Sequence, residues 1–68
     1  MKIVAKPDTF ARARILRGYS QRELAKRAGL SHAYVSMLER SMKSIGPAAA
    51  KRLSEALEVP METLFTIS

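Results

Sequence analysis

A glycine within the most helical stretch of the chain most strongly limits how this sequence can fold. Residues 20–40 read SQRELAKRAGLSHAYVSMLER, with helix-forming residues on both sides of Gly29. Glycine in a helix interior costs roughly 0.5–1 kcal/mol relative to alanine, and Ser31 can cap a new helix two residues later. The sequence therefore predicts two short helices separated by a turn, and not one long helix.

Start and stop signals set the bounds of these two helices. Ser20 followed by Glu23 forms a capping box, which is typical of a helix start, and Gly29 can adopt the left-handed conformation that ends the helix. The next helix covers about residues 32–40 and directs Val35 and Leu38 inward. Three further residues form the inner face of the preceding helix: Leu24, Ala25 and Ala28.

Three more helices are expected around this pair. Asp8 is the predicted cap of a first helix over residues 9–17, which Gly18 ends and whose inner face holds Phe10, Ala13 and either Leu16 or Arg17. A proline at position 47 favours a fourth helix from there to about residue 58, and METLF (61–65) predicts a short fifth helix. Residues 1–7 form either a disordered tail or a short extended arm. We therefore expect an all-α five-helix domain over residues 8–68.

Composition narrows the possible partners. Twelve basic residues against 6 acidic ones give a net charge of +6, which favours a polyanion such as nucleic acid or an anionic membrane surface. The chain has no cysteine, one histidine and one aspartate, so we expect no disulfide and no metal site. No apolar run is long enough to span a bilayer, and MKIVAK is too short for a signal peptide. We expect a cytoplasmic protein.

The two helices around Gly29 have the spacing of a helix-turn-helix, in which the first helix braces the second against DNA. Residues 10–65 resemble the Cro/C1-type (XRE-like) family of phage repressors. The matching positions include Gln21, Leu24, Ala25, Gly29, Ser31, Val35, Leu38 and Glu39, together with LSEALEVPMETLF. The resemblance implies a lambda-repressor-like bundle of five helices that binds operator DNA as a dimer. Ser41 departs from it, because the family commonly has glycine there, and Ile45 replaces a usual proline.

Helical spacing directs one face of the helix over residues 32–40 away from Val35 and Leu38. We expect base contacts from His32, Ala33, Ser36 and Met37, three of which (32, 33 and 37) match the family's base-contacting positions. The apolar side chains suit thymine methyl groups, and the scarcity of amide and guanidinium groups favours DNA shape as a source of specificity. The expected phosphate contacts are Gln21, by resemblance, and Arg22, Tyr34, Arg40, Lys43 and Ser44. The same face could instead contact a protein.

Two further expectations follow from the resemblance. Arg14 and Glu39 match family positions that form a buried ion pair between the first and third helices, so we assign them a structural role. Leu64, Phe65 and Ile67 cluster near the end of the chain, where the family commonly dimerises. A homodimer that assembles only on DNA is compatible with the absence of any further oligomerisation segment.

These observations favour a sequence-specific DNA-binding regulator associated with the nucleoid, most simply a repressor of phage or mobile-element type. The alternative is an antitoxin or another protein-interaction module with the same fold. An enzyme is disfavoured, because His32 has no carboxylate nearby in sequence and no glycine-rich phosphate loop is present. We expect no catalytic residue, no cofactor, no small-molecule ligand and no membrane partner.

Overall fold

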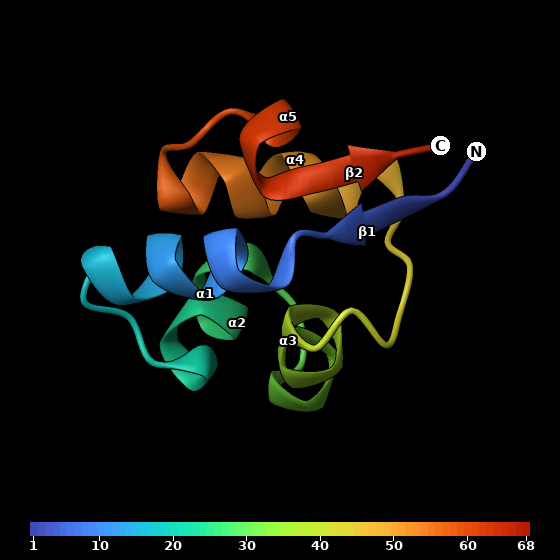
Figure 1. Cartoon of the computed structure of the whole chain (residues 1–68). Coiled ribbons are helices and arrows are strands. Elements are labelled where there is room, and N and C mark those ends of the chain that lie inside the picture. The colour runs from blue at the N-terminus through green and yellow to red at the C-terminus, as the bar shows by residue number, and fades with distance from the viewer.

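The computed structural model describes all 68 residues and contains five helices and two short strands. Along the chain these are β1 (Ile3–Ala5), α1 (Pro7–Leu16), α2 (Gln21–Ala28), α3 (His32–Glu39), α4 (Pro47–Leu57), α5 (Met61–Leu64) and β2 (Phe65–Ile67). In Figure 1, α2 and α3 lie on one side of the molecule and α4, α5 and β2 on the other. The expected five helices are confirmed, and none is long and apolar enough to cross a membrane.

One hydrophobic core joins all the elements. Its largest fully buried side chains are Phe10, Phe65, Leu24, Leu38, Leu53, Leu57, Leu64 and Val35. The rings of Phe10 and Phe65 pack with their centroids 5.9 Å apart and tilted by 57°, which connects α1 to β2. Full burial of such side chains contributes about 1.5–3 kcal/mol each, and three of these eight, Leu24, Val35 and Leu38, come from the predicted inner faces of α2 and α3.

Four helices end in the same way, through a residue in the left-handed conformation. In each case the amide after that residue donates to the carbonyl five positions earlier, as in a Schellman motif: Tyr19 to Arg14, Leu30 to Ala25, Met42 to Met37 and Val59 to Ser54. The left-handed residues are Gly18 (φ +77°), Gly29 (+71°), Ser41 (+58°) and Glu58 (+57°). The stops at the two glycines are confirmed, whereas Ser41 and Glu58 take the same role without glycine's freedom.

The predicted caps of α2 and α3 are present. The hydroxyl oxygen of Ser20 accepts from the Glu23 amide at 3.0 Å, and that of Ser31 accepts from the Tyr34 amide at 3.1 Å. Only this half of the predicted capping box forms, because the Glu23 carboxylate accepts from Arg27 Nε instead, at 2.8 Å.

The start of α1 differs from the expectation. Asp8 is not the cap: α1 begins at Pro7, and Lys6 precedes it without a side-chain hydrogen bond. Proline suits a first helical position because the amide that it lacks would have no partner there. The inner face of α1 consists of Phe10 and Ala13, since Leu16 is 77% exposed and Arg17 is also exposed.

Residues 1–7 are part of the folded unit. Of the two alternatives left open for them, the structure contains the extended arm: β1 pairs antiparallel with β2, with Ala5 opposite Phe65. Ile3 and Ala5 are both 3% exposed and belong to the core, so a domain boundary between residues 7 and 8 is wrong. The pairing also shortens the fifth helix, because Phe65 becomes a strand residue.

Candidate nucleic-acid interface

The turn at Gly29 sets the arrangement of α2 and α3. Because Gly29 has a φ of +71°, the chain reverses between the helices without steric strain. Leu24 and Ala25 of α2 and Val35 and Leu38 of α3 are all buried in the same core. Close packing of two short helices across a glycine turn is the geometry of a helix-turn-helix.

The side of α3 away from the core is open to solvent. His32 and Ala33 are exposed in its first turn, and Met37 lies one turn later with 37% of its surface exposed. Ser36 is expected on the same face, but its side chain is half-buried and therefore less accessible than those of His32 and Ala33. This face combines the apolar side chains of Ala33 and Met37 with the polar groups of His32 and Ser36, which suits contact with base edges in a major groove.

The sequence predicts separate roles for Ser36, at the bases, and Arg40, at a phosphate. In the structure the two side chains contact each other. Arg40 Nη2 donates to Ser36 Oγ at 3.0 Å, one helical turn away. This contact holds the guanidinium at the C-terminal end of α3. Arg40 has no carboxylate partner, and so its charge remains available to a phosphate.

The expected ion pair between Arg14 and Glu39 is present and connects α1 to α3. Arg14 Nε and Nη2 donate to the two carboxylate oxygens of Glu39 at 2.7 and 3.0 Å, and the side chains are only 14% and 10% exposed. Arg14 also donates to the Tyr19 carbonyl at 2.8 Å. Gln21, which is expected to contact a phosphate, donates one N–H of its Nε2 to Glu39 at 3.3 Å. The second N–H of this amide remains available to a phosphate.

The remaining expected phosphate ligands border α3. Arg22 is exposed at the start of α2 and has no ion-pair partner. The ammonium of Lys43 lies 5.4 Å from the centre of the half-buried Tyr34 ring, and Ser44 is exposed in the loop after α3. The only carboxylate of α3 and this loop is Glu39, which Arg14 neutralises, whereas α4, its C-cap and α5 carry Glu55, Glu58 and Glu62. Arg22, Arg40 and Lys43, which border α3, are thus cations without an ion-pair partner, and α3 and the loop after it hold no free carboxylate.

Two of the three expected dimer contacts need correction. Leu64 is 0% exposed and Phe65 2% exposed, because both complete the core of their own chain. Neither can form a surface for a second copy while the chain is folded. Ile67, at 52% exposed, is the one that remains accessible.

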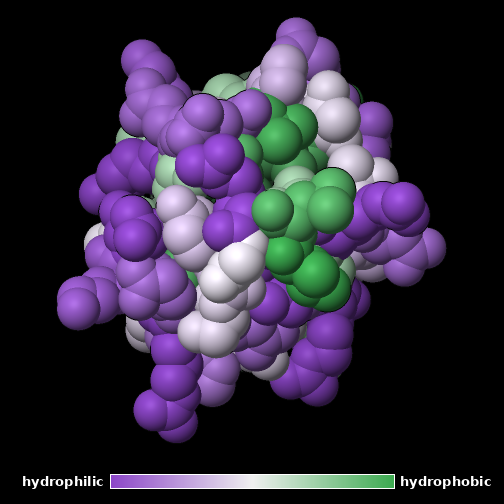
Figure 2. Space-filling view, turned by 90° about the vertical axis from the view of Figure 1, so that its left-hand side faces the viewer, coloured by the Kyte–Doolittle hydropathy of each residue, from purple (hydrophilic) through white to green (hydrophobic).

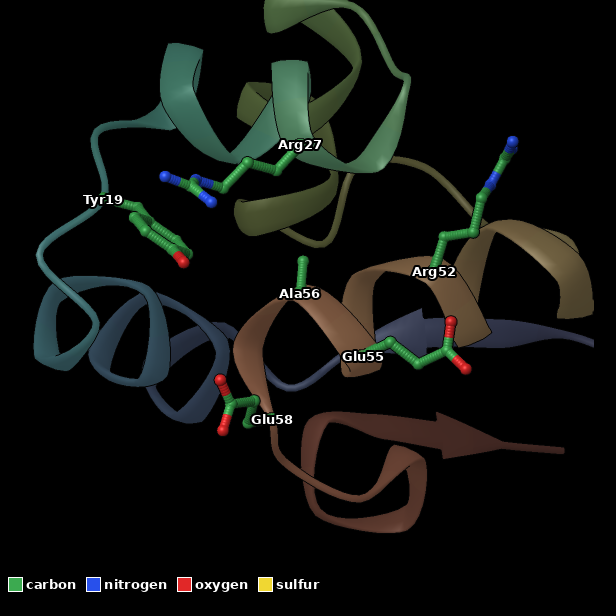
Figure 3. Close-up of a pocket in the computed structure, with 6 residues that line it drawn as sticks. All are labelled: Tyr19, Arg27, Arg52, Glu55, Ala56 and Glu58. Atoms are coloured by element: carbon green, nitrogen blue, oxygen red, sulfur yellow. The ribbon is translucent and has the colours of Figure 1, made fainter.

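Two surface pockets lie away from α3. A pocket of about 440 Å³ holds Arg27, Arg52, Glu55 and Glu58 beside Tyr19. In Figure 3, Arg27 extends towards Tyr19, and its guanidinium lies 4.6 Å from the centre of that ring. Two cations and two carboxylates balance the charge of this pocket. It is therefore no match for a polyanion.

The surface at the end of α1 is apolar, in contrast to the charged pocket beside Tyr19. Figure 2 views the molecule from the side at which α1 ends in Figure 1, and one hydrophobic patch stands out there in a mostly hydrophilic face. Ile15 and Leu16 of α1 are 62% and 77% exposed. They line a groove of about 520 Å³ together with Asp8, Thr9, Ala11 and Arg12. The patch is a local apolar feature and holds one cation, Arg12, and one carboxylate, Asp8.

Comparison with known proteins agrees with this geometry. The sequence profile of the helix-turn-helix family HTH_3 matches residues 10–64. The chain belongs to this family. The resemblance to XRE-type regulators is thereby confirmed, and the family and fold are those of DNA-binding transcription regulators and not of enzymes. A search of curated proteins found no match.

Several solved structures share the fold. The restriction-modification controller protein C.AhdI from Aeromonas hydrophila is 26% identical, with a TM-score of 0.78 over 84% of this chain and 86% of that one. The biofilm master regulator SinR, solved in complex with DNA, is 31% identical, with a TM-score of 0.74 over 79% and 87% of the two chains. A hypothetical transcription factor from Neisseria is 33% identical, with a TM-score of 0.75 over 79% of this chain. The present chain covers 61% of that Neisseria chain.

Proposed function

We propose that this helix-turn-helix protein is a transcriptional repressor that binds a palindromic operator as a homodimer. Helix α3 lies in the major groove, where His32, Ala33 and Met37 face the base edges. Arg22, Arg40 and Lys43 contact the phosphates on either side. A repressor of this kind acts by occupying an operator that overlaps a promoter, which blocks access to that promoter.

One observation carries this proposal. The exposed face of α3 is bordered by unpaired cations, while its only carboxylate is neutralised by Arg14 at 2.7 Å. A surface that combines apolar contact with free positive charge suits the major groove, where thymine methyl groups lie between rows of phosphates. SinR, which shares the fold, was solved in complex with DNA.

The homodimer is proposed through β2. Lys2 and Ser68 exchange both backbone hydrogen bonds, at 2.7 and 2.9 Å. In an antiparallel pair the neighbouring residue then directs its N–H and C=O to the opposite edge, and that residue is Ile67, opposite Ile3. An unpaired edge with an exposed isoleucine (52%) can pair with the same edge of a second copy.

Selection of random duplex DNA by the purified protein tests the proposal. We expect an enriched palindrome with half-sites about one helical turn, roughly 34–36 Å, apart. Enrichment of a single, non-palindromic half-site by a protein that binds as one chain would refute the dimer.

A matched pair of variants tests the role of α3. Ala33 and Ala48 are both exposed and both occupy the second position of a helix, in α3 and α4 respectively. Glutamate is favourable in the first turn of either helix, so both variants should fold. Ala33→Glu places a negative charge against the DNA and should weaken operator binding by about 100-fold or more, whereas Ala48→Glu should bind within a fewfold of wild type. Equal binding by the two variants would exclude α3 as the reading element.

The second candidate function is an antitoxin or another protein-interaction module. The observation that favours it is the apolar end of α1, where Ile15 and Leu16 are exposed. Such a module would enrich no operator and would bind a protein with little dependence on salt. The DNA selection therefore distinguishes the two functions directly.

A further inference from the structure

The N-terminal strand and the loop after α3 enclose a small basic groove. Its volume is about 370 Å³, and its walls are Lys2 and Val4 of the N-terminal segment and Ser41, Met42, Lys43 and Ser44 of the loop. Lys2 is not among the DNA contacts that the sequence predicts, because the sequence alone leaves the structure of residues 1–7 open.

Two hydrogen bonds join the loop to the strand. The Ile45 amide donates to the Ile3 carbonyl at 2.9 Å, and Ser41 Oγ donates to the Ala5 carbonyl at 2.7 Å. The backbone of Lys2 is itself held by the two bonds that it exchanges with Ser68. The two sides of the groove are therefore preorganised, so that a ligand here orders little more than the lysine side chains.

The groove has the donors that a phosphate requires. Lys2 and Lys43 are its only charged side chains, and neither takes part in an ion pair. Ser44 is exposed and its hydroxyl has no hydrogen-bond partner within the chain. Two ammonium groups and a hydroxyl, with no carboxylate among the lining residues, match one singly charged phosphodiester.

The position of the groove points to DNA as the source of that phosphate. The loop begins at the C-terminal end of α3, and β1 lies beside this loop in Figure 1. Strand β1 also contacts α3 directly. A phosphate in the groove would therefore belong to the DNA strand that borders the major groove occupied by α3.

We propose that Lys2, together with Lys43 and Ser44, binds a backbone phosphate of the operator, so that β1 forms part of the DNA-binding surface. This inference rests on the proposed function, since it requires α3 to lie in the major groove. The contact carries no base information of its own. It adds affinity on every sequence and fixes the angle at which α3 enters the groove.

The salt dependence of DNA binding tests the proposal. Each phosphate contact contributes about 0.9 to the slope of log affinity against log salt. Lys2→Gln combined with Lys43→Gln should lower that slope by about 0.9 per bound chain, so that the loss of affinity between 50 and 200 mM salt becomes about 3.5-fold smaller, and Lys2→Gln alone should lower the slope by part of that amount. Lys43→Gln should behave similarly, and Lys2→Arg should retain the wild-type slope.

Lys51→Gln is the matched control, because Lys51 is an exposed lysine on α4 without an ion pair. If Lys2→Gln and Lys51→Gln have the same slope of log affinity against log salt, while Ala33→Glu still weakens operator binding, the role of Lys2 is overturned and the proposed function stays intact. A wild-type protein that binds no duplex, or binding unaffected by Ala33→Glu, would instead refute the proposed function and this inference with it.

A chemical change in the DNA locates the contact. Replacing one operator phosphate at a time with a neutral methylphosphonate should reveal a position that weakens the wild-type protein more than it weakens Lys2→Gln, in which only Lys43 still contacts that phosphate. If every methylphosphonate weakens the two proteins equally, Lys2 touches no phosphate.

Discussion

Replacement of Arg14 by methionine should remove a large part of the stability of this chain. The Arg14 side chain is 14% exposed, and its guanidinium makes three hydrogen bonds, two to Glu39 and one to the Tyr19 carbonyl. Arg14→Met leaves the Glu39 carboxylate, 10% exposed, with Gln21 as its only donor at 3.3 Å. Breaking a buried pair by removal of one partner typically costs about 3–5 kcal/mol.

That loss is large relative to the whole molecule. At about 0.05–0.15 kcal/mol per residue, a chain of this length has a total stability of roughly 3–10 kcal/mol. Since 1 kcal/mol shifts the midpoint of a small domain by about 4–8 °C, Arg14→Met should lower Tm by more than about 12 °C. Thermal and urea unfolding followed by circular dichroism measure the effect.

A double-mutant cycle separates the ion pair from the burial of the two side chains. Arg14→Met with Glu39→Met removes both charges, and we expect the double variant to be more stable than either single one. Arg17→Met is the control, because its partner Glu58 is 65% exposed and an exposed pair contributes about 0–1 kcal/mol. A cost below about 1 kcal/mol for Arg14→Met, or an equal cost for Arg17→Met, would refute the structural role of the buried pair.

Two left-handed positions give further predictions. Gly29→Ala should destabilise the protein by about 1–2 kcal/mol through backbone strain alone, because the nearest side-chain atom to the added Cβ is Arg52 Nη1, at 3.9 Å; a Tm within 2 °C of wild type would contradict this. Ser41→Ala and Ser41→Gly both lose the hydrogen bond to the Ala5 carbonyl, but only glycine relieves the φ of +58°. The alanine variant should therefore unfold more easily than the glycine variant, by about 1 kcal/mol in urea titrations, and the reverse order would refute strain at Ser41.

The parts of the fold that the sequence predicted are those set by neighbouring residues. The caps at Ser20 and Ser31 and the stop at Gly29 depend on contacts within a few positions, and all three are present. The left-handed stop at Ser41 escaped prediction, because its hydroxyl bonds to Ala5, which lies 36 positions earlier.

Long-range pairing explains the errors at the two ends of the chain. Strands of three residues are too short for alternating hydrophobicity to identify them, so β1 remained one of two alternatives. The resemblance predicts a dimer contact at Leu64 and Phe65, and residue type alone does not distinguish the core of one chain from an interface between two. Their exposures of 0% and 2% assign them to the former.

The face of α3 was easier to predict than the contacts behind it. The inward positions Val35 and Leu38 fix the rotation of the helix, and Ala33 and Met37 are accordingly exposed. The hydrogen bond from Gln21 to Glu39 has no signal in sequence, because its two residues lie 18 positions apart on different helices.

Helix α3 is held at its C-terminal end from two independent directions. Glu39, its last residue, is fixed to α1 by Arg14 at 2.7 Å, and Ser41, two residues later, is fixed to β1 through Ala5 at 2.7 Å. The second contact joins the end of α3 to β1, which pairs with β2, so Ser41 connects the two chain ends to α3. Pairing of β2 with a second copy would stabilise β1, and with it the loop that carries Lys43. Dimerisation and phosphate binding would then be coupled through the two strands.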